Sequence, residues 1–383
     1  MQNRLNQAIY NTKKSPIRVY SQLAAETKGC IALTLGEPNF DTPAPITQAA
    51  VDSLHSGDTH YIANAGSMDL RKEIAAYEKR EHGMTYAPEE IIVTVGATEA
   101  LFIALMGILN PGDEVIIPLP AFLLYGEIVN LARGRAVYLD TSQDRFQIRA
   151  DKLNELITDR TKAIILNSPN NPTGSFLNND SLEAVRKAVS GRGIFVICDD
   201  VYRSLVYRSD YRSFSEYQDL KEQILLVQSF SKPYAMTGWR MGYLAGDAAV
   251  MERLTLLHQY NIVSTPAPFQ KACIQALHTS TDEMFVKYRR RRDYMLRRLR
   301  GMDLEVPEPL GAFYQFPSIK EYGMTSGEFC TRMIKEAGLA ATPGGCFGCG
   351  DHIRFSYCCS DRNLMEGMDR LQGFLNKLKG EKA

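Results

Sequence analysis

The chain has 383 residues, of which 45% are hydrophobic and 23% are charged, and its 44 lysines and arginines balance its 44 aspartates and glutamates. This composition excludes an intrinsically disordered chain and argues against a broadly basic nucleic-acid binder. The length provides enough material for one large domain or two smaller ones with a sizeable core.

Neither an export signal nor a membrane helix is expected. Residues 1–16, MQNRLNQAIYNTKKSP, lack an apolar core, and no later stretch approaches the roughly 20 apolar residues of a membrane helix. We therefore expect a cytoplasmic protein without a membrane partner. The eight cysteines are too sparse for a disulfide scaffold, so we expect reduced thiols.

Short apolar runs rich in β-branched residues alternate with segments of helical period through the middle of the chain. This alternation predicts parallel strands joined by helices, and therefore an α/β domain over residues 41–275. The expected helices include residues 98–109 and 180–189. The expected strands are residues 91–95, 114–119, 162–167, 194–200 and 224–230.

Residues 276–383 begin with a charged amphipathic segment that predicts a connecting helix. A helix around 326–337, a Gly-rich loop at 344–350, the short strand HIRFSYC and a final helix to about residue 379 follow. We expect these pieces to form a smaller α+β domain, which residues 1–40 join. The apolar face of the connecting helix carries Phe285, Tyr288, Met295, Leu296 and Leu299.

The strongest local signal is SFSKPYAMTGWRMG, residues 229–242. It begins at the end of an apolar strand, where a parallel sheet opens its ligand crevice. A lysine in such a crevice, here Lys232, is desolvated, so its pKa falls and its amine can form a Schiff base. Taken alone, a lysine at a strand end is more often a solvated surface residue.

The surrounding pattern resembles the lysine signature of class I pyridoxal-phosphate aminotransferases, which have the aspartate aminotransferase fold (fold type I). The resemblance covers almost the whole chain and implies a large domain with a mainly parallel seven-stranded sheet and a smaller α+β domain. The shared motifs, in family order, are GEPNF (36–40); Tyr61 with Gly66, Leu70 and Arg71; GAT (96–98); Pro118, Pro120, Phe122 and Tyr125; Asn167 with PNNPTG (169–174); Asp199 with Tyr202; and Pro343-Gly344 leading to Arg354-Phe355-Ser356.

The resemblance implies that Lys232 holds pyridoxal 5'-phosphate as a Schiff base and moves the proton during catalysis. Asp199 ends an apolar strand, and a carboxylate buried there needs a cationic partner or becomes protonated. The implied partner is the pyridine nitrogen, which makes the cofactor ring an electron sink. Tyr202 and Asn171 are implied to bond the phenolic oxygen of the cofactor.

The cofactor phosphate needs hydrogen-bond donors and positive charge. Ala97 and Thr98 lie at the start of an expected helix, whose N–H groups and dipole suit an anion, and Ser229 and Arg240 add a hydroxyl and a guanidinium. Phe122 occupies the position where relatives place an aromatic ring against the cofactor, often Tyr or Trp.

The substrate side of the site rests on three further residues that the resemblance implies. Arg354 makes the two-pronged bond to the α-carboxylate, with Asn171 and the backbone of Gly36 near the same group. The resemblance also implies that Tyr61 reaches the phosphate of the neighbouring subunit's cofactor, so a homodimer with shared active sites is expected.

The implied reaction is a ping-pong transfer of an amino group from an L-amino acid, such as aspartate or an aromatic one, to a 2-oxo acid such as 2-oxoglutarate. The segments LHQYNIVS (257–264) and FPSIKEYGMTS (316–326) are similar to the branch that includes N-acetyl-diaminopimelate aminotransferases. A carbon–sulfur β-lyase on the same fold and a non-catalytic sensor of pyridoxal phosphate stay open as alternatives.

Two features permit other interpretations. Cys346 and Cys349, with Cys358 and Cys359, are compatible with a zinc knuckle or a redox pair, whereas the resemblance implies no metal. The basic run at 287–300, KYRRRRDYMLRRLR, is compatible with nucleic-acid binding. Its helical spacing favours a solvated helix face, so no nucleic-acid partner is expected.

Overall fold

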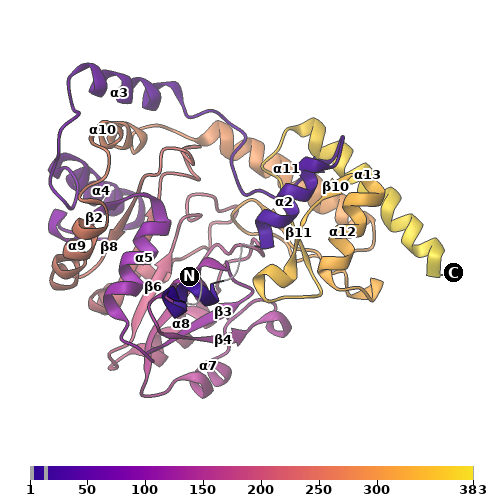
Figure 1. Cartoon of the computed structure of the whole chain (residues 1–383), viewed down its shortest axis with the longest axis horizontal. Helices are drawn as coiled ribbons and strands as arrows, with labels where there is room; N and C mark the ends of the chain where they lie inside the picture. The colour runs from indigo at the N-terminus through magenta and orange to yellow at the C-terminus, as the bar shows by residue number, and fades with distance from the viewer. Residues whose placement is uncertain (1–3, 13–15, 383) are drawn as a thin grey trace.

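A computed structural model describes residues 4–12 and 16–382. Its centre is a seven-stranded sheet with the order β2-β8-β7-β6-β5-β3-β4 (Figure 1). All neighbours are parallel except β8, which is antiparallel to both β2 and β7. The predicted α/β class with a mainly parallel seven-stranded sheet is confirmed. The strands are β2 (Ile91–Thr94), β3 (Glu114–Leu119), β4 (Arg135–Asp140), β5 (Thr161–Asn167), β6 (Phe195–Asp199), β7 (Ile224–Ser229) and β8 (Gly242–Ala245).

Helices cover both faces of this sheet, which is why its central strands are apolar throughout. One face packs against α4, α8 and α10, and the other against α5, α6 and α9. The helices of this part are α3 (Ala44–His55), α4 (Met68–His82), α5 (Gly96–Ile108), α6 (Leu124–Leu131), α7 (Ala150–Leu156), α8 (Asn179–Val189), α9 (Ala248–Ile262) and α10 (Ala267–Ala276).

The five strands expected from the sequence are present as β2, β3, β5, β6 and β7. The sequence did not predict β4 or β8. The β4 strand lies at the sheet edge and is mostly exposed or half-buried, so it lacks the apolar signal of its neighbours. The β8 strand has only four residues and follows directly after the lysine motif.

The C-terminal part of the chain forms a second group of elements, at the right of Figure 1. Its core joins residues of three helices to two short sheets and to Ile31 and Leu33 from the N-terminal part. The predicted domain boundaries at residues 40 and 275 stay predictions. The elements are α11 (Asp282–Gly301), α12 (Ser326–Ala337), α13 (Asp361–Lys382), β1 (Ile31–Ala32) paired with β10 (Leu339–Ala340), and β12 (Ile353–Ser356) between β9 (Tyr314–Gln315) and β11 (Thr342–Pro343).

The helix α12 shows how local sequence sets these boundaries. Thr325 caps its first turn and Glu328 bonds back to the Thr325 backbone, which satisfies donors that the helix itself leaves free. Gly338 ends the helix at φ 59°, a conformation that glycine adopts without strain. The described part of the chain also contains 3-10 helices at Pro88–Glu90, Ser142–Asp144, Phe214–Glu216, Gln218–Gln223, Lys320–Tyr322 and Gly344–Phe347.

The N-terminal helices lie in different places. The first, α1 (Gln7–Asn11), contacts α6, where Asn130 donates to the Ala8 carbonyl at 3.3 Å. The second, α2 (Pro16–Glu26), packs against β10 and α12. Within residues 4–12 and 16–382, no helix is both long and apolar enough to cross a bilayer.

The basic helix α11 corrects one expectation. Its cationic face was predicted to be solvated, and this is confirmed for the exposed Lys287, Arg289, Arg290, Arg297 and Arg300, but Arg291 is buried. Its guanidinium pairs with Asp361 at 2.8 Å and donates to Asn39 at 2.7 Å. The start of α13 covers this part of α11, so this arginine joins two elements and is not available to an external ligand.

Candidate active site

The carboxyl ends of the central strands bring the candidate residues together. In the sheet register, Asn167 lies beside Asp199, and Ser229 lies beside Gly242. A cavity of about 280 Å³ opens at this edge. The candidate residues that line it are Gly36, Ala97, Thr98, Phe122, Asn171, Asp199, Tyr202, Ser229, Lys232, Arg240 and Arg354.

Tyr61 is the predicted site residue that the cavity does not contain. It lies in the loop between α3 and α4, and 88% of its surface is exposed. Within one chain, it therefore contributes nothing to the site.

Asp199 places an incompletely paired carboxylate at the bottom of the cavity. Its Oδ2 accepts a hydrogen bond from the Tyr125 hydroxyl at 2.5 Å, while Oδ1 has no partner among the described residues. Burial raises the pKa of Asp199 to about 6, although the bond from Tyr125 opposes the shift. The carboxylate therefore has one free acceptor that a cation entering the cavity would satisfy.

Lys232 presents its amine to the same cavity. Its Nζ donates to the Gly36 carbonyl at 2.6 Å and lies 5.9 Å from the centre of the Phe313 ring. Burial lowers the pKa of Lys232, and the nearby Arg354 and Arg240 add to this effect. The amine is therefore closer to its neutral, nucleophilic form than a solvated lysine.

A cradle of backbone donors lies at the other end of the cavity. The helix α5 begins at Gly96, which has φ 74°, and a Cβ there would come within 2.9 Å of Arg240 Nη2. A Cβ at Gly242 would lie 3.0 Å from the Ala97 nitrogen and 2.6 Å from a strand carbonyl. Both glycines thus allow the guanidinium, the helix N-terminus and β8 to approach closely. Such an arrangement suits a phosphate group.

Arg354 is a buried cation with donors directed at several neighbours. Nη1 donates to Asn171 Oδ1 at 2.7 Å, and Nη2 donates to the Thr34 carbonyl at 2.5 Å. The guanidinium lies 4.5 Å from the Tyr314 ring centre and 4.9 Å from that of Phe347. Its Nε has no partner among the described residues. These contacts fix the orientation of the Arg354 guanidinium and leave it an N–H donor that can bind an anion.

Two tyrosines in the site were not assigned a role from the sequence. Tyr125, whose hydroxyl donates a hydrogen bond to Asp199, belongs to the family motif that contains Pro118, Pro120 and Phe122. The hydroxyl of Tyr314 lies 2.8 Å from that of Tyr202, and the Tyr314 ring packs under Arg354. Tyr314 thus connects Tyr202 with Arg354. No motif of the sequence analysis includes Tyr314.

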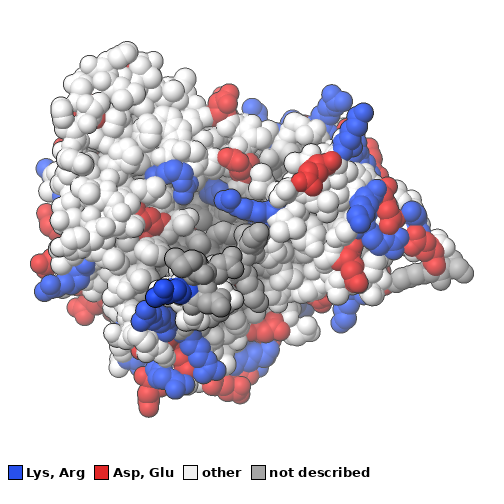
Figure 2. Space-filling view, viewed as in Figure 1, with Lys and Arg blue, Asp and Glu red and all other residues white. Residues whose placement is uncertain are grey.

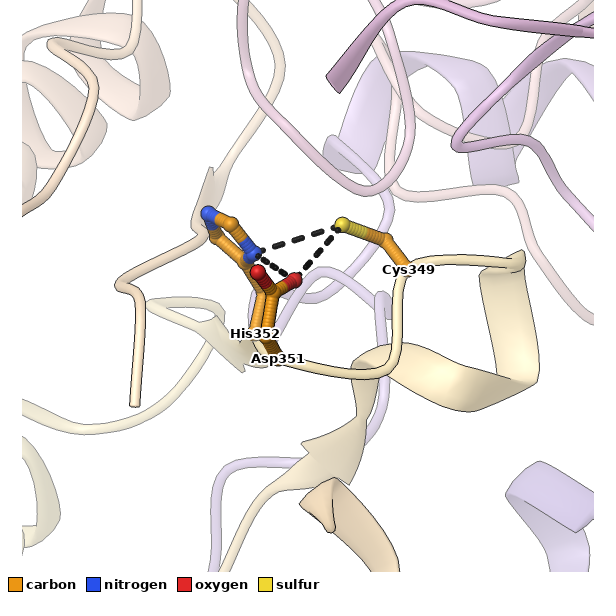
Figure 3. A group of neighbouring side chains, drawn as sticks. All are labelled: Cys349, Asp351 and His352. Carbon is orange, nitrogen blue, oxygen red and sulfur yellow. Dashed lines mark hydrogen bonds and ion pairs between the residues drawn. The ribbon is translucent and has the colours of Figure 1, made fainter. Parts of the chain in front are cut away.

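The structure does not bring the four C-terminal cysteines together. All eight cysteines are free thiols, and the four do not form a shared metal-binding group among the described residues. Instead, Cys349 lies beside Asp351 and His352 (Figure 3). A four-thiol zinc knuckle is therefore the wrong interpretation of this region.

The residues that are present fit pyridoxal phosphate on chemical grounds. The unpaired oxygen of Asp199 suits a protonated ring nitrogen, and the amine of Lys232 suits the aldehyde. The donors at the start of α5, together with Ser229 and Arg240, suit the phosphate. Phe122 offers an aromatic ring on the cavity wall.

Comparisons with known proteins agree with this chemistry. Residues 28–371 match the family described as Aminotransferase class I and II. The chain is 37% identical to the probable N-acetyl-LL-diaminopimelate aminotransferase of Bacillus subtilis, covering 98% of this chain and 97% of the relative. It is 38% identical to an aspartate aminotransferase of Pyrococcus abyssi, covering 95% and 96% of the two chains.

A solved structure shows the same relationship. The aspartate aminotransferase of Thermus thermophilus with maleate superposes with a TM-score of 0.91 at 34% identity, over 96% of this chain and 99% of that one. The family uses pyridoxal phosphate and acts on amino acids and oxo acids. The chain is therefore an aminotransferase that belongs to class I and II and has fold type I.

Proposed function

We propose that this aminotransferase transfers the amino group of an L-amino acid to a 2-oxo acid in two half-reactions, with Lys232 at the centre of the chemistry. One observation carries the proposal: a buried carboxylate with a free oxygen, a lysine amine of lowered pKa and a buried guanidinium face one cavity. These groups supply the base, the electrostatic partner and the carboxylate clamp that transamination requires.

Asp199 and Lys232 would hold the two reactive parts of pyridoxal phosphate, the ring nitrogen and the aldehyde carbon. When bound, the cofactor supplies an electron-withdrawing ring that stabilises negative charge at the substrate Cα. Asp199 would keep a proton on the ring nitrogen because its Oδ1, unpartnered among the described residues, would gain a cationic partner there. Tyr202 and Asn171 line the same cavity and would orient the ring.

Lys232 also serves as the acid and base of the reaction. With a substrate amino acid bound at the site, the neutral amine of Lys232 would accept the proton from the substrate Cα and hold it for return. Its lowered pKa favours this role because a larger fraction of the amine is neutral, and able to accept a proton, than in a solvated lysine. The Gly36 carbonyl, 2.6 Å away, is an acceptor that can orient the amine.

Arg354 binds the α-carboxylate that every amino acid and 2-oxo acid shares. Its guanidinium is held between two rings and bonded to Asn171, so little conformational freedom is lost when the carboxylate arrives. Because the site is buried, the charged bond is stronger than it would be in water.

The side-chain preference of the enzyme is a finer proposal. Among the described residues that line the cavity, the cations are Lys232, Arg240 and Arg354, each already assigned a role. The remaining wall includes Leu35 and Leu101. We propose aspartate, aromatic or related L-amino acids as donors, and a 2-oxo acid such as 2-oxoglutarate as the acceptor.

Spectroscopy of the half-reactions tests this proposal. Single amino acids are added to the cofactor-loaded protein while the cofactor absorbance is followed, and oxo acids are then added one at a time. We expect a donor to bleach the absorbance and 2-oxoglutarate to restore it. Release of pyruvate and ammonia without an acceptor would indicate a β-lyase. A bound cofactor that responds to no amino acid would indicate a sensor.

We also propose a homodimer in which Tyr61 completes the neighbouring subunit's phosphate site. Tyr61 is 88% exposed, and its loop joins the end of α9 where Asn64 donates to the Val263 carbonyl at 2.8 Å. Tyr260 on the same end of α9 is 84% exposed. Figure 2 shows few charged side chains over α3, next in sequence to this loop. Exposed aromatic residues on a weakly charged surface favour a protein partner.

Mixed dimers test the shared site. One chain carries Tyr61→Phe and the other carries Lys232→Ala, so one site has both lesions and the other has neither. We expect the intact site to retain cofactor and work like the wild type. The proposal fails if the surviving lysine site still shows the weakened cofactor retention of Tyr61→Phe, or if sedimentation finds an active monomer.

A further inference from the structure

Three metal-ligand atoms of different kinds converge in the loop before β12. Cys349 Sγ lies 3.3 Å from His352 Nδ1 and 3.4 Å from Asp351 Oδ1, and those two atoms are 2.8 Å apart. Figure 3 shows the three side chains directed toward one another. None of them lines the candidate active site, so the transamination chemistry does not use them.

The backbone of the loop holds this arrangement in place. Gly344 N donates to the His352 carbonyl at 2.8 Å, and Cys349 N donates to the Gly344 carbonyl at 3.0 Å. Gly348 has φ 82°, which permits the turn that leads into Cys349. The His352 ring stacks on Phe316, with ring centres 4.9 Å apart and planes at 15°. The imidazole and the thiol are therefore positioned before any ligand arrives.

Exposure differs among the three groups in a way that suits an ion site with an entrance. Cys349 is 4% exposed. The His352 side chain is 14% exposed and that of Asp351 is 43% exposed. An ion can thus approach past the carboxylate and reach the buried sulfur. Water can fill the position that the protein leaves open.

We propose that Cys349, Asp351 and His352 form a three-residue site for a divalent transition-metal ion of the zinc type. Tetrahedral bonds of about 2.3 Å to sulfur and about 2.0–2.2 Å to nitrogen and oxygen place the ligand atoms roughly 3.4–3.6 Å apart. The sulfur distances of 3.3 and 3.4 Å nearly match this requirement. The nitrogen and oxygen, now 2.8 Å apart, separate slightly when the ion replaces their hydrogen bond.

The ligand set also selects among ions. Thiolate and imidazole favour zinc and its neighbours, whereas magnesium and calcium prefer oxygen ligands alone. Binding displaces the Cys349 proton to water, so the neutral thiol becomes the thiolate ligand. The sequence led us to expect no metal, because only the four cysteines were weighed as ligands and not Cys349 together with Asp351 and His352. The proposed metal site does not depend on which amino donor or acceptor the enzyme uses.

The position of the site predicts a structural role. The Phe347 carbonyl in the same loop accepts from Ala121 N at 3.0 Å, next to Phe122. Arg354 lies in β12, two residues after His352. An ion here would stabilise the loop that supports both cavity residues without taking part in the reaction.

Metal retention and X-ray absorption test the site. The cofactor-loaded enzyme is stripped with a chelator, incubated with Zn²⁺ and desalted, and its zinc content is measured for the wild type, Cys349→Ser and His352→Gln. Cys346→Ser is the matched control, a buried cysteine in the same loop that belongs to no metal-binding group.

We expect one retained zinc per chain in the wild type and in Cys346→Ser, and at least a tenfold lower zinc content in both ligand variants. The absorption spectrum should show one sulfur at about 2.3 Å with nitrogen and oxygen ligands. Equal zinc in all four proteins, no retained zinc in the wild type, or a shell without sulfur would each overturn the proposal. If Cys349→Ser does not fold, the spectrum and His352→Gln decide.

Discussion

Replacing Asp199 by asparagine should stabilise the cofactor-free protein at neutral pH, although the same change should damage catalysis. The carboxylate is buried, and only one of its oxygens has a partner among the described residues. Burial raises its pKa from 3.8 to about 6. This shift of roughly two pKa units corresponds to about 3 kcal/mol of unfolding free energy, which the protein loses when the Asp199 carboxyl group ionises.

The direction of the pH dependence follows from the raised pKa of Asp199. As the pH rises from about 4, the unfolded chain releases this proton first, while the folded protein keeps it until about pH 6. Stability is therefore lost across that window. Asparagine stays neutral and still accepts a bond from Tyr125, so the variant should gain about 3 kcal/mol at pH 7.5 and about 1 kcal/mol at pH 4.5.

Urea unfolding of the cofactor-free proteins at both pH values measures this gain. The control is Asp140→Asn, which removes an exposed carboxylate at the end of β4 and should change stability by less than about 0.5 kcal/mol. Adding pyridoxal phosphate should shrink or reverse the gain, because the ring nitrogen then pairs with Asp199. An asparagine variant that is no more stable at pH 7.5, or whose gain does not vary with pH, would refute the reasoning.

Further substitutions probe other contacts of the site and the core. Arg354→Ala should weaken binding of every amino acid and oxo acid by about 2–5 kcal/mol, measured as the change in kcat/KM for an aromatic and an acidic donor; a loss confined to the acidic donor would contradict the assignment. Tyr314→Phe keeps the ring under Arg354 but removes the hydrogen bond to Tyr202, so its kcat should fall several-fold. Tyr314→Leu also removes the ring and should therefore raise KM as well. Identical kinetics for the two variants would contradict these roles. Arg203→Ala leaves the buried Glu78 carboxylate without its ion pair and should lower the free energy of unfolding in urea by about 3–5 kcal/mol. A loss below about 1 kcal/mol would show that this ion pair contributes little to stability.

The sequence predicted those parts of the site that depend on strand ends and local motifs. Asp199 and Ser229 end apolar strands, and parallel topology alone places such positions at one edge of the sheet. Lys232 and Arg240 lie within one short segment whose pattern is typical of the family. Local order and fold class were therefore sufficient for these residues.

The remaining features depend on packing between distant segments. Tyr314 reaches Tyr202 across 112 positions of sequence, a contact that no periodicity encodes. Arg291 has the spacing of a solvated residue, but the start of α13 covers it and supplies Asp361. Cys349 was grouped with other cysteines by spacing, whereas the turn after it brings Asp351 and His352 to its sulfur.

The central claim is that Lys232 holds the cofactor, and chemical labelling tests it most directly. Reduction of the cofactor-loaded enzyme with borohydride fixes the cofactor on the amine that carries it, and mass spectrometry of the peptides then locates the modified lysine. The account predicts a phosphopyridoxyl group on the peptide that contains Lys232 and none on the corresponding peptide of Lys232→Ala. A label on a different lysine of the wild type, or a label retained in full by the variant, would contradict it.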